Sequence, residues 1–227
     1  SEHTIKVFKD SKYDKHKKGT NELIGGIRMR EDLKTEVLFE GVDTSIFHQT
    51  ARIEDTVTDV LKDIKEDFCF LFVGHWLQGS IGHDRKDVGS LISTFCQAFI
   101  NKPSRTRPAL ILKTSSAGYS VSDRKELLKK INAIQKAVTE QTGKKCPSVY
   151  LLHGDLSDEE MNSLYNHHKV KAMVSFTKGE GFGRPLLEFS FVGKPVIAPK
   201  WSGQLDFLNE KFTTLLPGTL EDVHSSV

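Results

Sequence analysis

The segment 179–188, Gly-Glu-Gly-Phe-Gly-Arg-Pro-Leu-Leu-Glu, combines residue types that can hold a hydroxylated ring next to a phosphate. Its three alternating glycines let backbone N–H groups approach a ligand, because no Cβ stands in the way. Glu180 and Glu188 can each accept hydrogen bonds from two vicinal hydroxyls, as sugar and ribose rings present them. The same pattern also fits a tight turn followed by an acid that stabilises a helix N-terminus.

Basic residues gather near the same predicted edge. The segments that follow the predicted strands contain several glycines, very few acids and the basic residues Arg85, Lys86, Lys113, Lys178 and Arg184. Cations beside a helix N-terminus form a natural phosphate site. The alternative is that these side chains are ordinary solvated surface.

The elements that must position these residues are visible as short apolar runs. Six candidate strands lie at 68–73, 109–112, 148–152, 172–176, 195–198 and 213–216. Continuous apolar runs of this length are typical of strands buried on both faces of a parallel sheet.

The segments between the strands carry apolar residues at helical spacing. The clearest stripes lie in 88–99 and 127–138, and we expect the second of these helices to be capped by Ser122 and Asp123. Ser157 and Pro185 indicate two further helix starts. The alternation predicts an α/β fold with a doubly wound parallel sheet, whose ligand lies beyond the carboxyl ends of the strands.

Composition excludes several classes of protein. The 227 residues carry a formal net charge of only +2, which gives no indication of nucleic-acid binding. The longest apolar run, 68–73, is too short to span a membrane, and the first residues are polar. Three scattered cysteines without a CxxC pair indicate reduced thiols, so we expect a cytoplasmic protein.

The sequence also lacks the motifs of several enzyme classes. It contains no GxSxG, no Walker lysine loop and no GxGxxG after the first strand, which disfavours hydrolase, P-loop NTPase and NAD enzyme functions. His153, His167 and His168 have no Cys or carboxylate partners at zinc spacing, so we expect no metal site.

Several ordered motifs together resemble the C-terminal half of retaining glycosyltransferases of the GT-B fold, family 4. The segment 179–188, continued by 193–198, resembles the paired-glutamate region of that family. Residues 40–47 resemble its "NGVDxxxF" turn, 72–74 with 85–87 its "vGR…KG" stretch, and 152–157 with 164–165 its "G-x-l…l-Y" segment. The resemblance implies a Rossmann-like half of a GT-B enzyme and covers most of the chain.

The resemblance implies a role for each matching residue. Glu180 would bind the hydroxyls of the donor sugar, Glu188 would hold the ribose, and Lys86 would neutralise the diphosphate leaving group. The backbone of residues 181–183 would line the sugar and phosphate. The expected catalytic residues are therefore Glu180, Lys86 and Arg85, and the expected donor-binding residues are Gly74, His75, Lys113, Asp155, Leu156, Gly181, Phe182, Gly183, Arg184 and Glu188.

The chain departs from the family pattern at a few positions. His75 stands where the family has an arginine, and we expect Arg85 to substitute for it. Arg184 replaces the usual leucine of "GFGLP", and Ser202-Gly203 replaces a glycine pair ahead of Asp206.

The resemblance implies transfer of a sugar from a nucleoside-diphosphate sugar, with retention at the anomeric carbon, to an unknown saccharide, lipid or other acceptor. The absence of a DxD sequence agrees with chemistry that needs no metal and no further cofactor. Residues 1–50 would be the tail of an N-terminal acceptor domain with its linker, and 51–227 the donor-binding domain, so the chain would be a fragment that is inactive alone. Alternatives are a non-catalytic nucleotide-sugar-binding module and a GT-B-fold epimerase or phosphorylase.

Overall fold

The computed structural model describes residues 1–29, 32–77, 82–116 and 118–222. Its main part is a six-stranded sheet in which every neighbouring pair of strands is parallel. The strands are β3 (Cys69–Val73), β4 (Ala109–Lys113), β5 (Val149–Leu152), β6 (Val170–Val174), β7 (Val196–Pro199) and β8 (Thr213–Leu216). The six predicted strands are confirmed, with ends that differ from the prediction by at most two residues.

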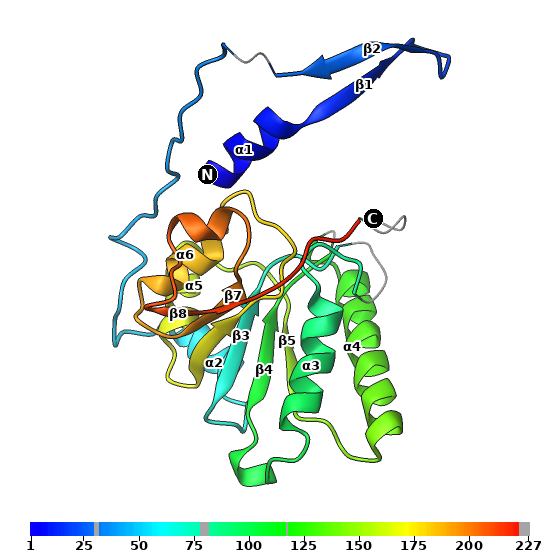
Figure 1. Ribbon diagram of the computed structural model, residues 1–227. Helices are drawn as coiled ribbons and strands as arrows, with labels where there is room; N and C mark the ends of the chain where they lie inside the picture. The colour runs from blue at the N-terminus through cyan, green and yellow to red at the C-terminus, as the bar shows by residue number, and fades with distance from the viewer. Residues whose placement is uncertain (30–31, 78–81, 117, 223–227) are drawn as a thin grey trace.

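The strand order is β5-β4-β3-β6-β7-β8, as in a doubly wound Rossmann-like sheet. Starting from β3, the chain first builds outward to β5 and then returns to place β6 on the other side of β3 (Figure 1). The order therefore reverses between β3 and β6. In open α/β sheets this switch point is where the loops diverge and leave a crevice for a ligand.

Helices cover both faces of the sheet. The helices between the strands are α2 (Asp55–Leu61), α3 (Val88–Phe99), α4 (Val121–Thr142), α5 (Asp158–Asn166) and α6 (Arg184–Ser190), with short 3₁₀ turns η1 (Ser104–Thr106) and η2 (Gly203–Asp206). One apolar core joins α2, α5 and α6 to the sheet, and a second joins α3 and α4 to it. All five residues of β4 are buried, as the continuous apolar run predicts.

The start of α4 differs from the prediction. Its N-cap is Ser120, whose Oγ accepts a 3.0 Å hydrogen bond from the backbone N–H of Asp123. The expected caps Ser122 and Asp123 are wrong, because the Asp123 carboxylate instead accepts from Ser116 and contacts His153. The expected start of α5 is confirmed by a complete capping box between Ser157 and Glu160.

The first residues form separate elements above the sheet. Helix α1 (Glu2–Asp10) leads into an antiparallel hairpin of β1 (Lys12–His16) and β2 (Leu23–Arg28), and none of these elements has a buried residue. An extended segment then connects the hairpin to the main part of the chain (Figure 1). The start of α1 contacts η2, where the Glu2 backbone N–H donates to the Asp206 carboxylate at 3.3 Å.

Candidate functional site

The loops at the switch point meet each other through backbone contacts. Residues 74–77 and 82–87 lie between β3 and α3, and loop 175–183 leads from β6 to α6. The Lys178 backbone N–H donates to the Arg85 carbonyl at 2.8 Å, and the Arg85 guanidinium donates to the Gly179 carbonyl at 2.7 Å. The two glycine-containing loops therefore form one connected rim.

Glu180 is fixed at this rim through its backbone. Its N–H donates to the Ser202 hydroxyl at 2.8 Å, and its carbonyl accepts from the Gly203 N–H at 3.0 Å. Gly203 must be a glycine, because a Cβ there would lie 2.1 Å from the Gly181 carbonyl oxygen. The turn after β7 thus fixes the position of the Gly179–Gly183 loop through these two hydrogen bonds.

The Glu180 carboxylate binds two cations from the opposite loop. Lys86 Nζ contacts Oε1, and Arg85 Nη1 lies 3.2 Å from Oε2. The Lys86 and Glu180 side chains are only 12% and 11% exposed, whereas Arg85 is 51% exposed. The structure thus brings Glu180, Lys86 and Arg85 into contact with one another.

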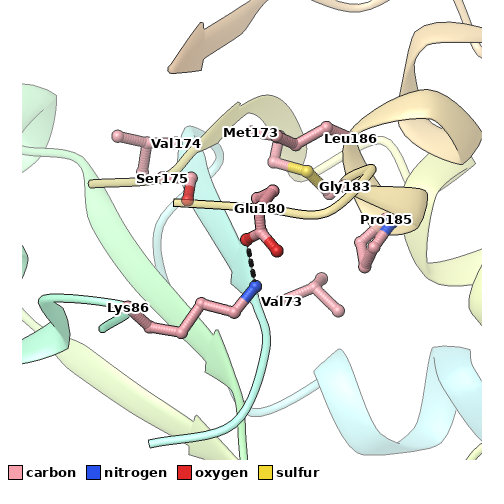
Figure 2. Close-up of a pocket in the computed structure, with 9 residues that line it drawn as sticks. All are labelled: Val73, Lys86, Met173, Val174, Ser175, Glu180, Gly183, Pro185 and Leu186. Atoms are coloured by element: carbon pink, nitrogen blue, oxygen red, sulfur yellow. Dashed lines mark hydrogen bonds and ion pairs between the residues drawn. The ribbon is translucent and has the colours of Figure 1, made fainter. Parts of the chain in front are cut away.

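A small pocket lies around this ion pair. Figure 2 shows the Lys86 and Glu180 side chains pointing toward each other across it. The pocket is lined by Val73, Lys86, Met173, Val174, Ser175, Glu180, Gly183, Pro185 and Leu186. Gly74, at the end of β3, leaves room for the Lys86 stem, since a Cβ there would lie 3.3 Å from Lys86 Cε.

Glu188 lies one turn into α6 and is buried. Tyr165 donates its hydroxyl to Oε2 at 2.9 Å, and Arg184 Nε donates to Oε1 at 2.7 Å. Burial raises the pKa of Glu188, whereas the hydrogen bonds from Tyr165 and Arg184 act to lower it. Arg184 Nη2 also lies 3.6 Å from the Asp158 carboxylate at the start of α5. Glu188 does not line the pocket that contains Glu180.

The ends of β4 and β5 bring the remaining predicted residues together. Lys113 is buried, donates to the Gly154 carbonyl at 2.6 Å, and has its pKa lowered by that burial. Asp155 accepts from the Leu156 N–H at 3.1 Å. His75 Nδ1 lies 3.1 Å from the Ser115 hydroxyl at the neighbouring strand end.

Phe182 lies at the other side of the loop. Its ring packs against Phe39 and Phe207, at centroid distances of 5.0 and 5.2 Å. Of the segment 181–183, only Gly183 is among the residues that line the pocket.

Three polar residues of the site were not predicted for the roles they have. Tyr165 belongs to the segment that resembles the family's "l-Y" motif, but no role was predicted for it, and its hydroxyl donates to Glu188. Asp123 reads as a cap, yet it pairs with His153 at 2.8 Å in a buried contact. Ser202 supports Glu180, and its position beside the glycine of the "GG"-like segment was the available signal.

Among the described residues, no group of three or more His, Cys, Asp or Glu side chains is arranged to hold a metal ion. Within the same ranges, no helix has the length and hydrophobicity needed to cross a bilayer.

The fold of this chain is found in other proteins of known structure. The chain has the α/β fold of the C-terminal domains of GT-B glycosyltransferases of group 1. It is similar to the C-terminal domain of the glycosyl transferase group 1 family protein LpcC from Francisella tularensis, with 18% identity and a TM-score of 0.54, over 78% of this chain and 80% of that one. No protein-family model and no curated protein sequence matches the chain.

Two larger structures show the same fold. Anabaena HepE, solved in complex with UDP-glucose, is 19% identical with a TM-score of 0.51, over 81% of this chain and 44% of HepE. Sucrose-phosphate synthase from Thermosynechococcus elongatus is 20% identical with a TM-score of 0.53, over 78% of this chain and 38% of the synthase. The chain thus spans less than half the length of these two proteins.

Proposed function

We propose that this chain binds a nucleoside-diphosphate sugar at the switch point and supplies the donor half of a retaining, metal-independent glycosyltransferase of family 4, with a hexosyl group as the sugar transferred. The observation that carries the proposal is the pairing of Glu180 with Lys86 and Arg85 at the switch point. The likeness to HepE, whose structure contains UDP-glucose, supports the choice of ligand.

In this proposal each charged residue has a distinct task. Lys86 and Arg85 bind the diphosphate and stabilise the negative charge that grows on it as the glycosidic bond breaks, which lowers the barrier. Glu180 binds the sugar hydroxyls, and Glu188 binds the ribose. Residues 1–50 belong to the acceptor domain and its linker, residues 51–227 form the donor domain, and the acceptor binds between the two.

We also propose a cytoplasmic location. Cys69, Cys96 and Cys146 are buried free thiols, and burial raises the pKa of Cys69 and of Cys96 to about 12. Thiols of this kind are usual in a reducing compartment.

Calorimetric titration with UDP, GDP, ADP and their glucose conjugates tests the ligand class. We expect one nucleotide series to bind, and Lys86→Ala and Glu188→Ala each to weaken binding at least about tenfold, as expected for charged contacts. Lys136→Ala is the matched control, because Lys136 lies on α4 with its side chain 77% exposed. Absence of heat with every nucleotide, or binding that is indifferent to both site variants, would contradict the proposal.

A non-catalytic nucleotide-sugar-binding module is the second candidate. Arg184, which stands where the family pattern has a leucine and donates to Glu188 at 2.7 Å, is the departure from the enzyme pattern that raises this candidate. Binding without sugar transfer or donor hydrolysis, in a chain that includes an acceptor domain, would select the module over the enzyme.

A further inference from the structure

The pair of Lys86 and Glu180 joins two loops that are far apart in the sequence. The residues are 94 positions apart and come from opposite sides of the switch point. Arg85 takes the second oxygen of the same carboxylate at 3.2 Å. Each oxygen of Glu180 therefore holds one of the two cations that the proposed function assigns to the diphosphate.

A phosphate ligand must compete with Glu180 for these cations. A phosphomonoester carries a charge of about −1.5 to −2 at neutral pH, on oxygens of a single phosphorus atom. A diphosphate presents oxygens on two phosphorus atoms, so it can contact Lys86 and Arg85 together. A diphosphate therefore has more oxygens with which to replace both partners of Glu180 in one step, and it competes with the carboxylate better than a single phosphate group does.

Displaced from its cations, Glu180 needs new hydrogen-bond donors. The side chain is 11% exposed, and a carboxylate with little access to water is costly unless it is paired or hydrogen-bonded. The vicinal hydroxyls of a sugar attached to the diphosphate would supply such donors. A nucleoside diphosphate with no sugar attached to its terminal phosphate would not supply these donors.

We propose that Glu180 determines specificity by ion-pair exchange. In the free protein its carboxylate pairs with Lys86 and Arg85. When a diphosphate-linked sugar binds, the diphosphate takes over these two cations and the sugar hydroxyls donate hydrogen bonds to the Glu180 carboxylate. The inference rests on the proposed function and deepens it. It orders the ligands by affinity as nucleoside-diphosphate sugar, then nucleoside diphosphate, then nucleoside monophosphate. The sugar and the diphosphate are thereby recognised together rather than separately.

Glu180→Gln tests the exchange, because the amide keeps the shape and removes the competing charge. The probes are UDP-glucose, UDP and UMP, or the matching series of whichever nucleotide binds, titrated by calorimetry. We expect UMP to bind at least about tenfold more tightly to the variant and UDP only about threefold more tightly, since the loss of a charged partner matters most for the weaker competitor. UDP-glucose should lose its advantage over UDP. Glu140→Gln, at an exposed carboxylate on α4, is the control and should change none of the three constants.

A second background separates competition from simple charge repulsion. The Lys86→Met variant has no Lys86 ammonium for Glu180 and the phosphate to compete for. Adding Glu180→Gln to this variant should therefore tighten UMP binding by less than about twofold. The same tightening in both backgrounds, or an unchanged UDP-to-UMP ratio in Glu180→Gln, would overturn the exchange. If the wild-type protein binds no nucleotide at all, both the proposed function and the ion-pair exchange are wrong. If it binds UDP through Lys86 but Glu180→Gln leaves the ratio unchanged, only the exchange fails.

Discussion

The Tyr165 hydroxyl donates a 2.9 Å hydrogen bond to Oε2 of Glu188 and so ties α5 to the carboxylate of α6. The Tyr165 ring is fully buried, and burial together with the neighbouring Glu188 raises the pKa of the phenol well above its ordinary value. The phenol therefore remains a proton donor at every pH at which the protein would function. Its bond fixes the direction in which Glu188 points.

Tyr165→Phe should destabilise the fold in a pH-dependent way. The change leaves a buried carboxylate with one donor fewer, which costs about 1–3 kcal/mol. Because the pKa of Glu188 is raised in the folded state, its contribution to stability falls as pH rises through that pKa. Losing the Tyr165 bond raises the pKa further, so the loss of unfolding free energy should be larger at pH 7 than at pH 4.5. Urea denaturation at both pH values measures it, and an equal loss at both would contradict the role of Tyr165.

Arg184→Leu should raise the pKa of Glu188, because the guanidinium charge and its hydrogen bond both act to lower it. Asp158→Asn is the informative comparison, since the Asp158 charge acts in the opposite direction on the same carboxyl. The carboxyl ¹³C resonance of Glu188, followed through a pH titration, should move to a higher midpoint in the first variant and to a lower midpoint in the second. Shifts of the same sign would exclude an electrostatic coupling of the three residues.

Gly203→Ala should displace the Gly179–Gly183 loop. The new Cβ would stand 2.1 Å from the Gly181 carbonyl oxygen and 2.7 Å from that of Glu180, so the backbone must move. We expect a loss of about 2–4 kcal/mol of unfolding free energy, as for other overpacked positions. Gly179→Ala is the matched control in the same loop, because a Cβ there meets nothing within 4 Å. Comparable thermal and urea stabilities of the two variants would refute the close approach.

His167 should make the protein acid-sensitive. The ring is buried, its Nδ1 accepts from the Lys169 N–H at 3.3 Å, and burial lowers its pKa to about 4. A depressed histidine pKa means that the unfolded state binds the proton more readily, so stability is lost as pH falls from about 6.5 to 4. His167→Asn keeps an acceptor in place of Nδ1 and should lose less stability over this range in urea denaturation. His48→Asn, at an exposed histidine, should behave as the wild type, and a His167→Asn curve parallel to the wild type would contradict the assignment.

The sequence was sufficient to predict the strands and the edge of the sheet at which the candidate site lies. It was not sufficient to predict which polar side chains contact each other there. Apolar periodicity records which face of an element is buried, and for β4 or α3 this determines the packing. It does not record which polar atoms meet across elements. Tyr165 has the spacing of a core residue, and only the tertiary structure brings its hydroxyl to Glu188.

The start of α4 illustrates the same limit locally. Ser120, Ser122 and Asp123 are all suitable caps by residue type, and the sequence offers no means to choose among them. The choice depends on His153, 30 positions away, which contacts the Asp123 carboxylate and leaves Ser120 to cap the helix.

The return of the chain from β5 to the centre of the sheet has a consequence for biosynthesis. Lys86 and Arg85 leave the ribosome long before Glu180, and β6 must find β3 across the intervening β4 and β5 units. Closing so long a loop is an entropically costly and slow step. A nascent chain therefore cannot form the pair of Lys86 and Glu180 until the loop before α6 has been synthesised, and the turn after β7 that holds this loop is made later still.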